Sequence, residues 1–301
     1  MPLIVAAILS GACFAVIGVG YYVGAKHRVA MPYVGCVMLV TGLLFFGGRA
    51  SFVPYQQSPL LYIVSAASGT SLFLCYLLMQ KAVKIGLLSS MWIALNLNFV
   101  PQALFCALRY HEKMGVSRWI GLSLGVLCIL VLSRQQAVGA GRNDNTAPSG
   151  SHSRLRCFFI LAGMLIVNSV FLTGTKVLSY HSLPEGVNLW TRGGDFFYCL
   201  SYAVGVVFCL PYLLLRLPYR EQFKPALISG LIGSAGAISG LGFISYCVSH
   251  RMSGTLCFPL SSITSIFGGS LAGILFFNEK PTPYFYAGNA LAAASILMFL
   301  V

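Results

Sequence analysis

The chain has 301 residues, of which 57% are hydrophobic and only 8% are charged. Soluble domains carry about 25% charged residues, and a soluble fold with so little charge would expose a large apolar surface and aggregate. The net charge of +13 does not indicate a nucleic-acid partner, because the basic residues are spread over many short gaps and form no long stripe. The composition excludes an ordinary soluble protein and predicts the lipid bilayer as the solvent of most of the chain.

Ten apolar runs follow one another along the sequence, and each is close to the roughly 20 residues that a helix needs to cross a bilayer. The runs are continuously apolar and do not alternate as barrel strands would. The first run lacks a basic segment before it, so we interpret it as a retained span and not as a cleaved signal peptide. We predict an all-α polytopic membrane protein with ten transmembrane helices, at residues 2–24, 29–48, 59–79, 86–108, 118–133, 157–178, 194–215, 225–248, 254–277 and 283–301.

One gap differs from the short connections elsewhere. Residues 134–156, "RQQAVGAGRNDNTAPSGSHSRLR", are polar and basic and contain Gly, Ser and Pro, a composition typical of a linker. Five apolar runs lie on each side of it. The sequence therefore predicts a first five-helix repeat at 1–133, a polar basic linker at 134–156, and a second five-helix repeat at 157–301.

A short motif occurs once in each half, as "EKMGVSRWIG" at 112–121 and "EKPTPYFYAG" at 279–288. Each copy closes the fourth run of its half and opens the fifth, and Pro59 and Pro225 open the third runs at almost the same offset. Because each half has an odd number of helices, the second half must start on the opposite side of the membrane. We therefore expect two inverted repeats, related by a pseudo-two-fold axis in the membrane plane, with a site between them near the midplane.

These features resemble the drug/metabolite transporter superfamily, and in particular its EamA-like members. The segment from Phe258 to Gly288 is similar to the C-terminal signature of that family, in which a proline-bearing ninth helix ends in Glu and the tenth begins with an aromatic residue and Gly. The resemblance covers the whole chain in architecture, but only the two motif segments are specific. It implies exchange or export of a small polar metabolite. The lysine-rich motifs of the nucleotide-sugar and triose-phosphate branches are not found, which leaves the substrate open.

Several polar side chains lie inside the apolar runs, where an amide or hydroxyl needs a partner. Such groups either hold helices together or contact a polar substrate, and hydroxyls often bond only to their own helix backbone. Gln102 follows Asn98 by four residues and shares its helix face. We predict a substrate cavity lined by Trp92, Asn96, Asn98, Asn168, Ser262 and Ser265.

Four charged groups leave two readings open. Lys176 stands deep in the sixth run and Arg49 ends the second, so each either serves function within the membrane or extends its side chain to the interface. Arg192 and Asp195 are three residues apart and form either a local ion pair or a gate.

Catalytic and metal-binding functions are disfavoured. The six acids lie outside the apolar cores of the runs, and the five histidines lie at run ends or in gaps, so we expect no catalytic residues, no metal and no cofactor. The ten cysteines form no CxxC motif and are interpreted as small packing residues. Without a carboxylate at mid-depth, we expect exchange or facilitated passage over carboxylate-driven proton antiport.

The sequence thus predicts a secondary transporter of a small-molecule substrate, working by alternating access, as a monomer or homodimer in a plasma or inner membrane. Two alternatives remain: a non-transporting membrane protein such as a scaffold or receptor subunit, and a transporter that exchanges sugars or nucleotide sugars.

Overall fold

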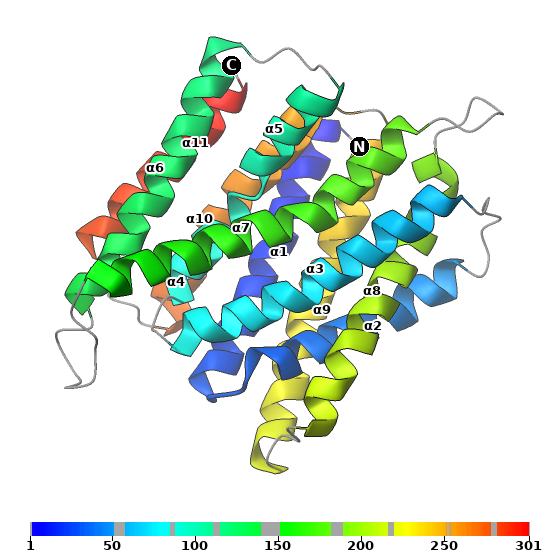
Figure 1. Ribbon diagram of the computed structural model, residues 1–301, viewed down its shortest axis with the longest axis horizontal. Coiled ribbons are helices and arrows are strands. Elements are labelled where there is room, and N and C mark those ends of the chain that lie inside the picture. The colour runs from blue at the N-terminus through cyan, green and yellow to red at the C-terminus, as the bar shows by residue number, and fades with distance from the viewer. Residues whose placement is uncertain are drawn as a thin grey trace.

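The computed structural model describes residues 2–50, 58–84, 88–110, 115–139, 151–181, 189–215, 220–250, 252, 254–277 and 282–300. Within these ranges the chain forms helices and no strands, and the helices make one bundle (Figure 1). The helices are α1 (Leu3–Lys26), α2 (Met31–Ala50), α3 (Pro59–Lys84), α4 (Leu88–Asn96), α5 (Phe99–Tyr110), α6 (Val116–Gly139), α7 (Ser151–Tyr180), α8 (Leu189–Leu215), α9 (Arg220–Ser249), α10 (Gly254–Phe277) and α11 (Pro283–Leu300).

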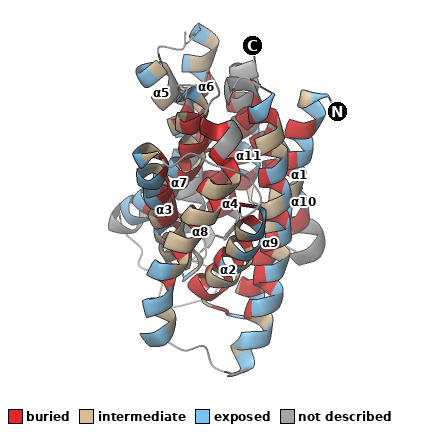
Figure 2. Ribbon diagram, turned by 90° about the vertical axis from the view of Figure 1, so that its right-hand side faces the viewer, coloured by how far each residue is buried: buried red, intermediate tan, exposed pale blue. Residues whose placement is uncertain are grey.

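Seven helical segments of the described chain are long and apolar enough to cross a membrane. The outer surface of the bundle carries large apolar side chains, such as Leu44, Leu108 and Val207, which are 72%, 71% and 66% exposed. Buried residues gather towards the inside of the bundle (Figure 2). The protein is therefore an all-α, multi-pass membrane protein, with spans of sufficient length and hydropathy at Leu3–Lys26, Met31–Ala50, Pro59–Lys84, Met91–Tyr110, Leu155–Tyr180, Gly193–Leu215 and Glu221–Ser249.

The helices of the N-terminal half (α1–α6) interleave with those of the C-terminal half (α7–α11). Helix α1 packs against α9 and α10, and α7 packs against α3, α4 and α5. Helix α2 packs against α8, and α6 against α11, so that α6 and α11 form a pair at one side of the bundle (Figure 1). The beginning of α1 and the end of α11 lie at the same end of the molecule (Figures 1 and 2). We call this end the terminal end.

Small residues allow α1 and α9 to approach closely. A Cβ atom added to Gly236 of α9 would lie 2.6 Å from the carbonyl oxygen of Cys13. A Cβ added to Gly20 of α1 would lie 2.9 Å from the backbone nitrogen of Gly233. Neither position has room for a side chain, so the two backbones are in direct contact along this crossing.

Two helices extend further than the apolar runs that predict them. Helix α6 continues to Gly139 and α7 begins at Ser151, so both enter the predicted 134–156 linker. Residues such as Arg134, Gln135 and Gln136 favour helix and need no burial, which explains how α6 continues beyond its apolar part. Residues 140–150 lie outside the described residues, as do the Glu-Lys pairs of the repeated motif at 112–113 and 279–280.

The fourth predicted span, at 86–108, is two helices and not one. Helix α4 ends at Asn96 and α5 begins at Phe99, with Leu97 and Asn98 in a turn between them. Pro101 lacks a backbone N–H, and its ring clashes with the carbonyl four residues earlier, which belongs to Leu97. That carbonyl instead accepts a hydrogen bond from the backbone N–H of Val100 at 3.0 Å. Asn98 therefore lies at a helix break and not within a continuous helix.

The α1–α9 contact predicts the effect of one substitution. We expect Gly236→Ala to lower the melting temperature of the purified protein, because overpacking at a backbone contact costs about 1–3 kcal/mol. Gly242, on the same helix, is the matched control, because nothing lies within 4 Å of a Cβ built there. Gly242→Ala should leave the melting temperature unchanged or slightly raised, since Ala favours helix over Gly. Equal melting temperatures for the two variants would contradict the close approach of α1 and α9.

Candidate functional site

A cavity of about 130 Å³ lies inside the bundle, between the two halves. Helices α1 to α4 and α7 to α10 each contribute side chains to its wall, and Asn98 contributes from the α4–α5 break. None of the described residues of α6 or α11 lines it. Phe14, Asn168 and Tyr202 lie near the middle of α1, α7 and α8, which places the cavity at mid-depth in the bundle.

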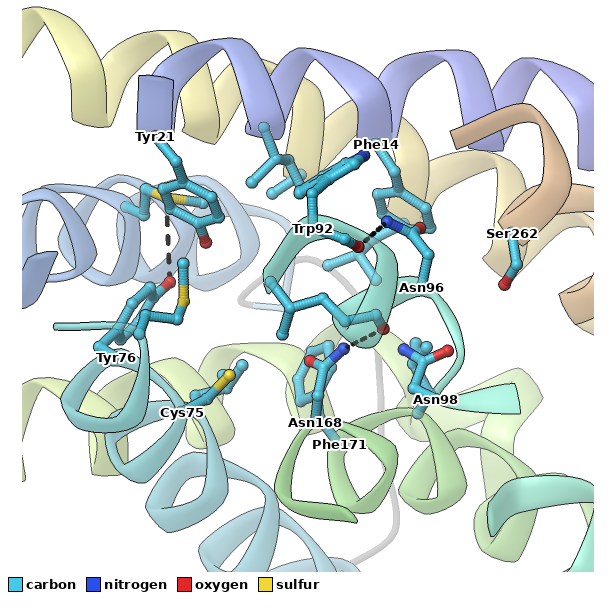
Figure 3. Close-up of a pocket in the computed structure, with 18 of the residues that line it drawn as sticks. Phe14, Tyr21, Cys75, Tyr76, Trp92, Asn96, Asn98, Asn168, Phe171 and Ser262 are labelled. Carbon is cyan, nitrogen blue, oxygen red and sulfur yellow. Dashed lines mark hydrogen bonds between the residues drawn. The ribbon is translucent and has the colours of Figure 1, made fainter. Parts of the chain in front are cut away.

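The polar part of the wall comes mainly from the α4–α5 break, α7 and α10 (Figure 3). The side-chain amide of Asn168 donates to the backbone carbonyl of Leu95 at 3.0 Å, which ties α7 to α4. The amide of Asn96 donates to the carbonyl of Trp92 at 2.9 Å, within its own helix. Each bond uses the NH₂ group, and the side-chain oxygens of both residues make no hydrogen bond that the structure records. Both amides therefore keep an acceptor available at the cavity.

Asn98 differs from the other two amides. Its side chain is 7% exposed and lines the cavity, yet it has no hydrogen-bond partner among the described residues. Ser262 of α10 is also 7% exposed, lines the cavity and has no such partner in the described chain. Buried polar groups are normally hydrogen-bonded, so unpartnered groups at a cavity are available to a bound molecule.

The rest of the wall is aromatic and apolar. The hydroxyl of Tyr76 lies 3.9 Å from the sulfur of Met38, and the ring of Tyr21 meets the indole of Trp92 edge-on at 6.3 Å between centroids. Phe171 and Tyr202 add two rings from the C-terminal half. A wall of this kind, mostly apolar with a few convergent polar groups, is typical of sites for small organic molecules.

Trp92 is wedged between helices that belong to different halves. Its indole N–H donates to the backbone carbonyl of Ser265 on α10 at 3.0 Å. Its ring lies against Gly269, where an added Cβ would clash with it, and a Cβ on Gly18 of α1 would come within 3.2 Å of it. The two glycines leave the space that the indole occupies, so they determine where this part of the cavity wall stands.

The structure brings five of the six predicted site residues to one cavity, namely Trp92, Asn96, Asn98, Asn168 and Ser262. Ser265 is fully buried and is not among the lining residues; its carbonyl holds Trp92 in place, and its hydroxyl has no partner in the described chain. The binding roles remain predictions. The sequence reading missed the lining hydroxyls of Tyr21, Tyr76 and Tyr202, although a tyrosine inside an apolar run is itself a polar signal.

The charged groups lie away from the cavity wall. Asp195 of α8 accepts a hydrogen bond from the guanidinium of Arg49 on α2 at 3.0 Å, so it pairs across the two halves. The side chain of Arg192, the partner expected from sequence, lies outside the described residues. Lys176 is 6% exposed and does not extend to solvent as its position near a helix end suggested. Among the described residues, no group of three or more His, Cys, Asp or Glu side chains could hold a metal ion.

The fold and cavity together define a class: a multi-pass helical membrane protein with a mostly apolar cavity between its two halves, which carries a few polar groups on its wall. No protein-family model and no curated protein matches the chain. A solved structure described as "Crystal structure of protein" is similar to it over 98% of both chains, with a TM-score of 0.59 and 14% sequence identity. The whole chain therefore shares its fold with a protein of known structure, and at this identity the likeness extends to the fold alone.

The position of Trp92 against α10 can be tested by a substitution that adds one methyl group. We expect Gly269→Ala to lower the melting temperature, because the new Cβ meets the indole and breaks its hydrogen bond to Ser265, at a cost of about 1–3 kcal/mol. Gly48→Ala is the matched control, since nothing lies within 4 Å of a Cβ at Gly48. If Gly269→Ala is as stable as Gly48→Ala, Trp92 does not sit against α10 as described.

Proposed function

We propose that the protein is a secondary transporter that moves a small polar metabolite across a membrane by alternating access. The two moving units would be inverted five-helix repeats, α1–α6 and α7–α11, with α4 and α5 counting as one interrupted helix. The observation that carries the proposal is the cavity at mid-depth, lined from both halves, with unpartnered polar groups on its wall. Transporters built from inverted repeats bind substrate at this place.

The pattern of helix contacts supports the repeat. Matching α1 with α7, α2 with α8, α3 with α9, the α4–α5 pair with α10, and α6 with α11 turns the largest contacts into others that are also present, whereas the α6–α7 contact has no comparable α11–α1 counterpart among the described residues. The α1–α9 contact becomes α7–α3, and the α1–α10 contact becomes α7 with α4 and α5. The α3–α8 contact becomes α9–α2, while α2–α8 and α6–α11 map onto themselves. A two-fold relation between the halves predicts this correspondence.

Two hydrogen bonds between α6 and α11 also support the two-fold relation between the halves. The thiol of Cys128 donates to the carbonyl of Gly288 at 3.1 Å, and the hydroxyl of Ser295 donates to the carbonyl of Gly121 at 2.6 Å. Gly288 follows Gly121 by 167 residues, and Ser295 follows Cys128 by the same 167 residues. Each bond is therefore the copy of the other with the halves exchanged. The pairing of early α6 with late α11 also makes the two helices antiparallel, as inversion requires.

The helix break gives a third argument. Backbone groups released by a break are tolerated at membrane depth only where protein or a water-filled cavity satisfies them. The turn at Leu97–Asn98 lies at the cavity wall, and interrupted helices at mid-depth are a recurrent feature of transporter binding sites.

The structure also bears on the two alternatives. A non-transporting scaffold or receptor subunit predicts that the polar groups of the fourth and ninth predicted spans bond to one another. Trp92 does bond to the carbonyl of Ser265 in this way, whereas Asn98 and Ser262 line the cavity and have no such bond in the described chain. A nucleotide-sugar exchanger needs a larger site, because drug-sized ligands occupy pockets of about 300–1,000 Å³. A cavity of about 130 Å³ favours a smaller substrate.

Inversion predicts opposite accessibility for equivalent positions. Val116 and Pro283 are the first residues of α6 and α11 and lie 167 residues apart. We expect Val116→Cys and Pro283→Cys to react with a membrane-impermeant thiol reagent from opposite sides of sealed, oriented vesicles. The unsubstituted protein is the control for its native thiols. Labelling of both positions from the same side would contradict the inverted arrangement.

Transport itself is tested with the purified protein in lipid vesicles. Thermal stabilisation by amino acids, nucleobases, sugars and organic cations identifies a ligand, and uptake of that compound into vesicles is then measured. We expect Asn98→Ala to reduce uptake about tenfold, which corresponds to the loss of one hydrogen bond of about 1.4 kcal/mol. Asn289→Ala is the matched control, because Asn289 is an amide on α11 outside the cavity wall. Equal uptake by the two variants would remove Asn98 from the site.

A further inference from the structure

Lys176 is a buried cation that lies outside the described lining of the proposed transport site. It is 6% exposed, and its ammonium lies 5.6 Å from the centroid of the Tyr180 ring. No described carboxylate pairs with it: Asp195 pairs with Arg49, and Glu221 lies in the first turn of α9. The other four acids fall in the connecting segments between apolar runs, outside the described residues. A buried charge without a partner is costly and marks a functional group by default.

Gln102 is a second buried polar group without a partner. Its side chain is 3% exposed, and neither its amide nitrogen nor its amide oxygen has a hydrogen-bond partner in the described chain. An amide deprived of water in this way costs about 1–3 kcal/mol for each unmade bond.

These two residues lie on neighbouring helices. Helices α5 and α7 are in contact and run parallel, because Asn168 bonds to Leu95 near the cavity and Tyr180 stacks on Tyr110 at the terminal end, with ring centroids 4.1 Å apart. Gln102 lies eight residues before Tyr110, and Lys176 lies four residues before Tyr180. Both therefore lie between the Leu95–Asn168 bond and the Tyr110–Tyr180 stack, with Lys176 about one helical turn nearer the terminal end.

Both residues also continue the polar faces of the cavity. Gln102 follows Asn98 by four residues, and Lys176 follows the lining residues Asn168 and Leu172 by eight and four, so each lies on the cavity-facing side of its helix. Gln102 and Lys176 therefore stand one helical turn beyond the wall, towards the terminal end.

We propose that Lys176 and Gln102 form an anion subsite of the cavity, which takes the carboxylate of a small organic acid. This inference rests on the proposed transport function and adds its substrate class. The ammonium and the amide NH₂ donate to the carboxylate oxygens, and a charge-assisted bond of this type is about twice as strong as a neutral one. The rest of the molecule lies among Asn98, Asn168 and the aromatic wall. No described lining residue carries a carboxylate that would attract an amine instead.

The test uses the whole purified protein and two matched series of probes at constant ionic strength. Benzoate, benzamide and benzylamine differ only in the polar group, as do pentanoate, pentanamide and pentylamine. We expect at least one carboxylate to raise the melting temperature of the wild type more than its amide and amine do. Lys176→Met should abolish that preference, Gln102→Leu should weaken it, and Lys176→Arg should keep it. Lys81→Met, at an exposed lysine near the end of α3, is the matched control and should keep the full shift.

A second measurement needs no ligand. Lys176→Met removes a buried charge that has no carboxylate partner among the described residues, so the ligand-free variant should melt about 2 °C or more above the wild type. If Lys176 instead stabilised the fold, the Lys176→Met variant would melt below the wild type. The subsite is overturned if no carboxylate stabilises the wild type, if the amides act as well as the carboxylates, or if Lys176→Met keeps the carboxylate shift or melts below the wild type.

Uptake into vesicles separates this inference from the transport proposal. If a carboxylate binds through Lys176 but is not carried into vesicles, the subsite stands and the transporter assignment fails. If an amine or a neutral compound is carried and Lys176→Met has no effect on its uptake, transport stands and the anion subsite fails.

Discussion

The proline at position 101 imposes the constraint on which the interior of this protein depends. It removes one hydrogen bond from a helix that would otherwise cross the bundle, and the chain turns at Leu97 and Asn98 in response. A turn at this depth is stable only when its polar groups face protein or a cavity. The break therefore places an amide at the centre of the molecule, and the surrounding helices leave space in front of it. The position of Asn98 at the cavity wall follows from that one missing N–H.

Close contacts between small residues hold the surrounding helices in place. Lipid supplies little hydrophobic drive for helices to associate, so packing and hydrogen bonds decide which helices meet. Glycines bring α1 against α9, and other glycines of α1 and α10 accept the indole of Trp92. Serines add bonds across the same region: Ser261 of α10 donates to Ser10 of α1 at 3.2 Å, and Ser10 donates to the carbonyl of Gly240 on α9 at 3.0 Å. These contacts hold two residues of the cavity wall, Trp92 and Ser261, against neighbouring helices.

The sequence predicts the class of fold and most of the polar wall, since both depend on which residues are polar within apolar runs. Asn96, Asn98, Asn168 and Ser262 stand out for that reason, and the structure brings them to one cavity. The helix break was missed because hydropathy is unaffected by a proline, whose effect falls on a carbonyl four residues earlier. Ser265 lies behind the wall, where its carbonyl accepts a hydrogen bond from Trp92, a contact between two helices that no local pattern records.

Other features depend on partners far apart in the chain. Asp195 bonds to Arg49, which is 146 residues distant and which no local spacing indicates as its partner. The burial of Lys176 likewise does not follow from its own position near the end of a span. Periodicity describes one helix at a time, and these contacts are made between helices.

The α6–α11 pair has a mechanical consequence. Its two reciprocal bonds lie on either side of the crossing, and neither helix contributes a described residue to the cavity wall. If one half tilts against the other, atoms near this seam move least and atoms at the opposite side of the bundle move most. The α6–α11 pair would then lie on the rotation axis. The Arg49–Asp195 salt bridge between α2 and α8 would have to break before these two helices could separate at the terminal end.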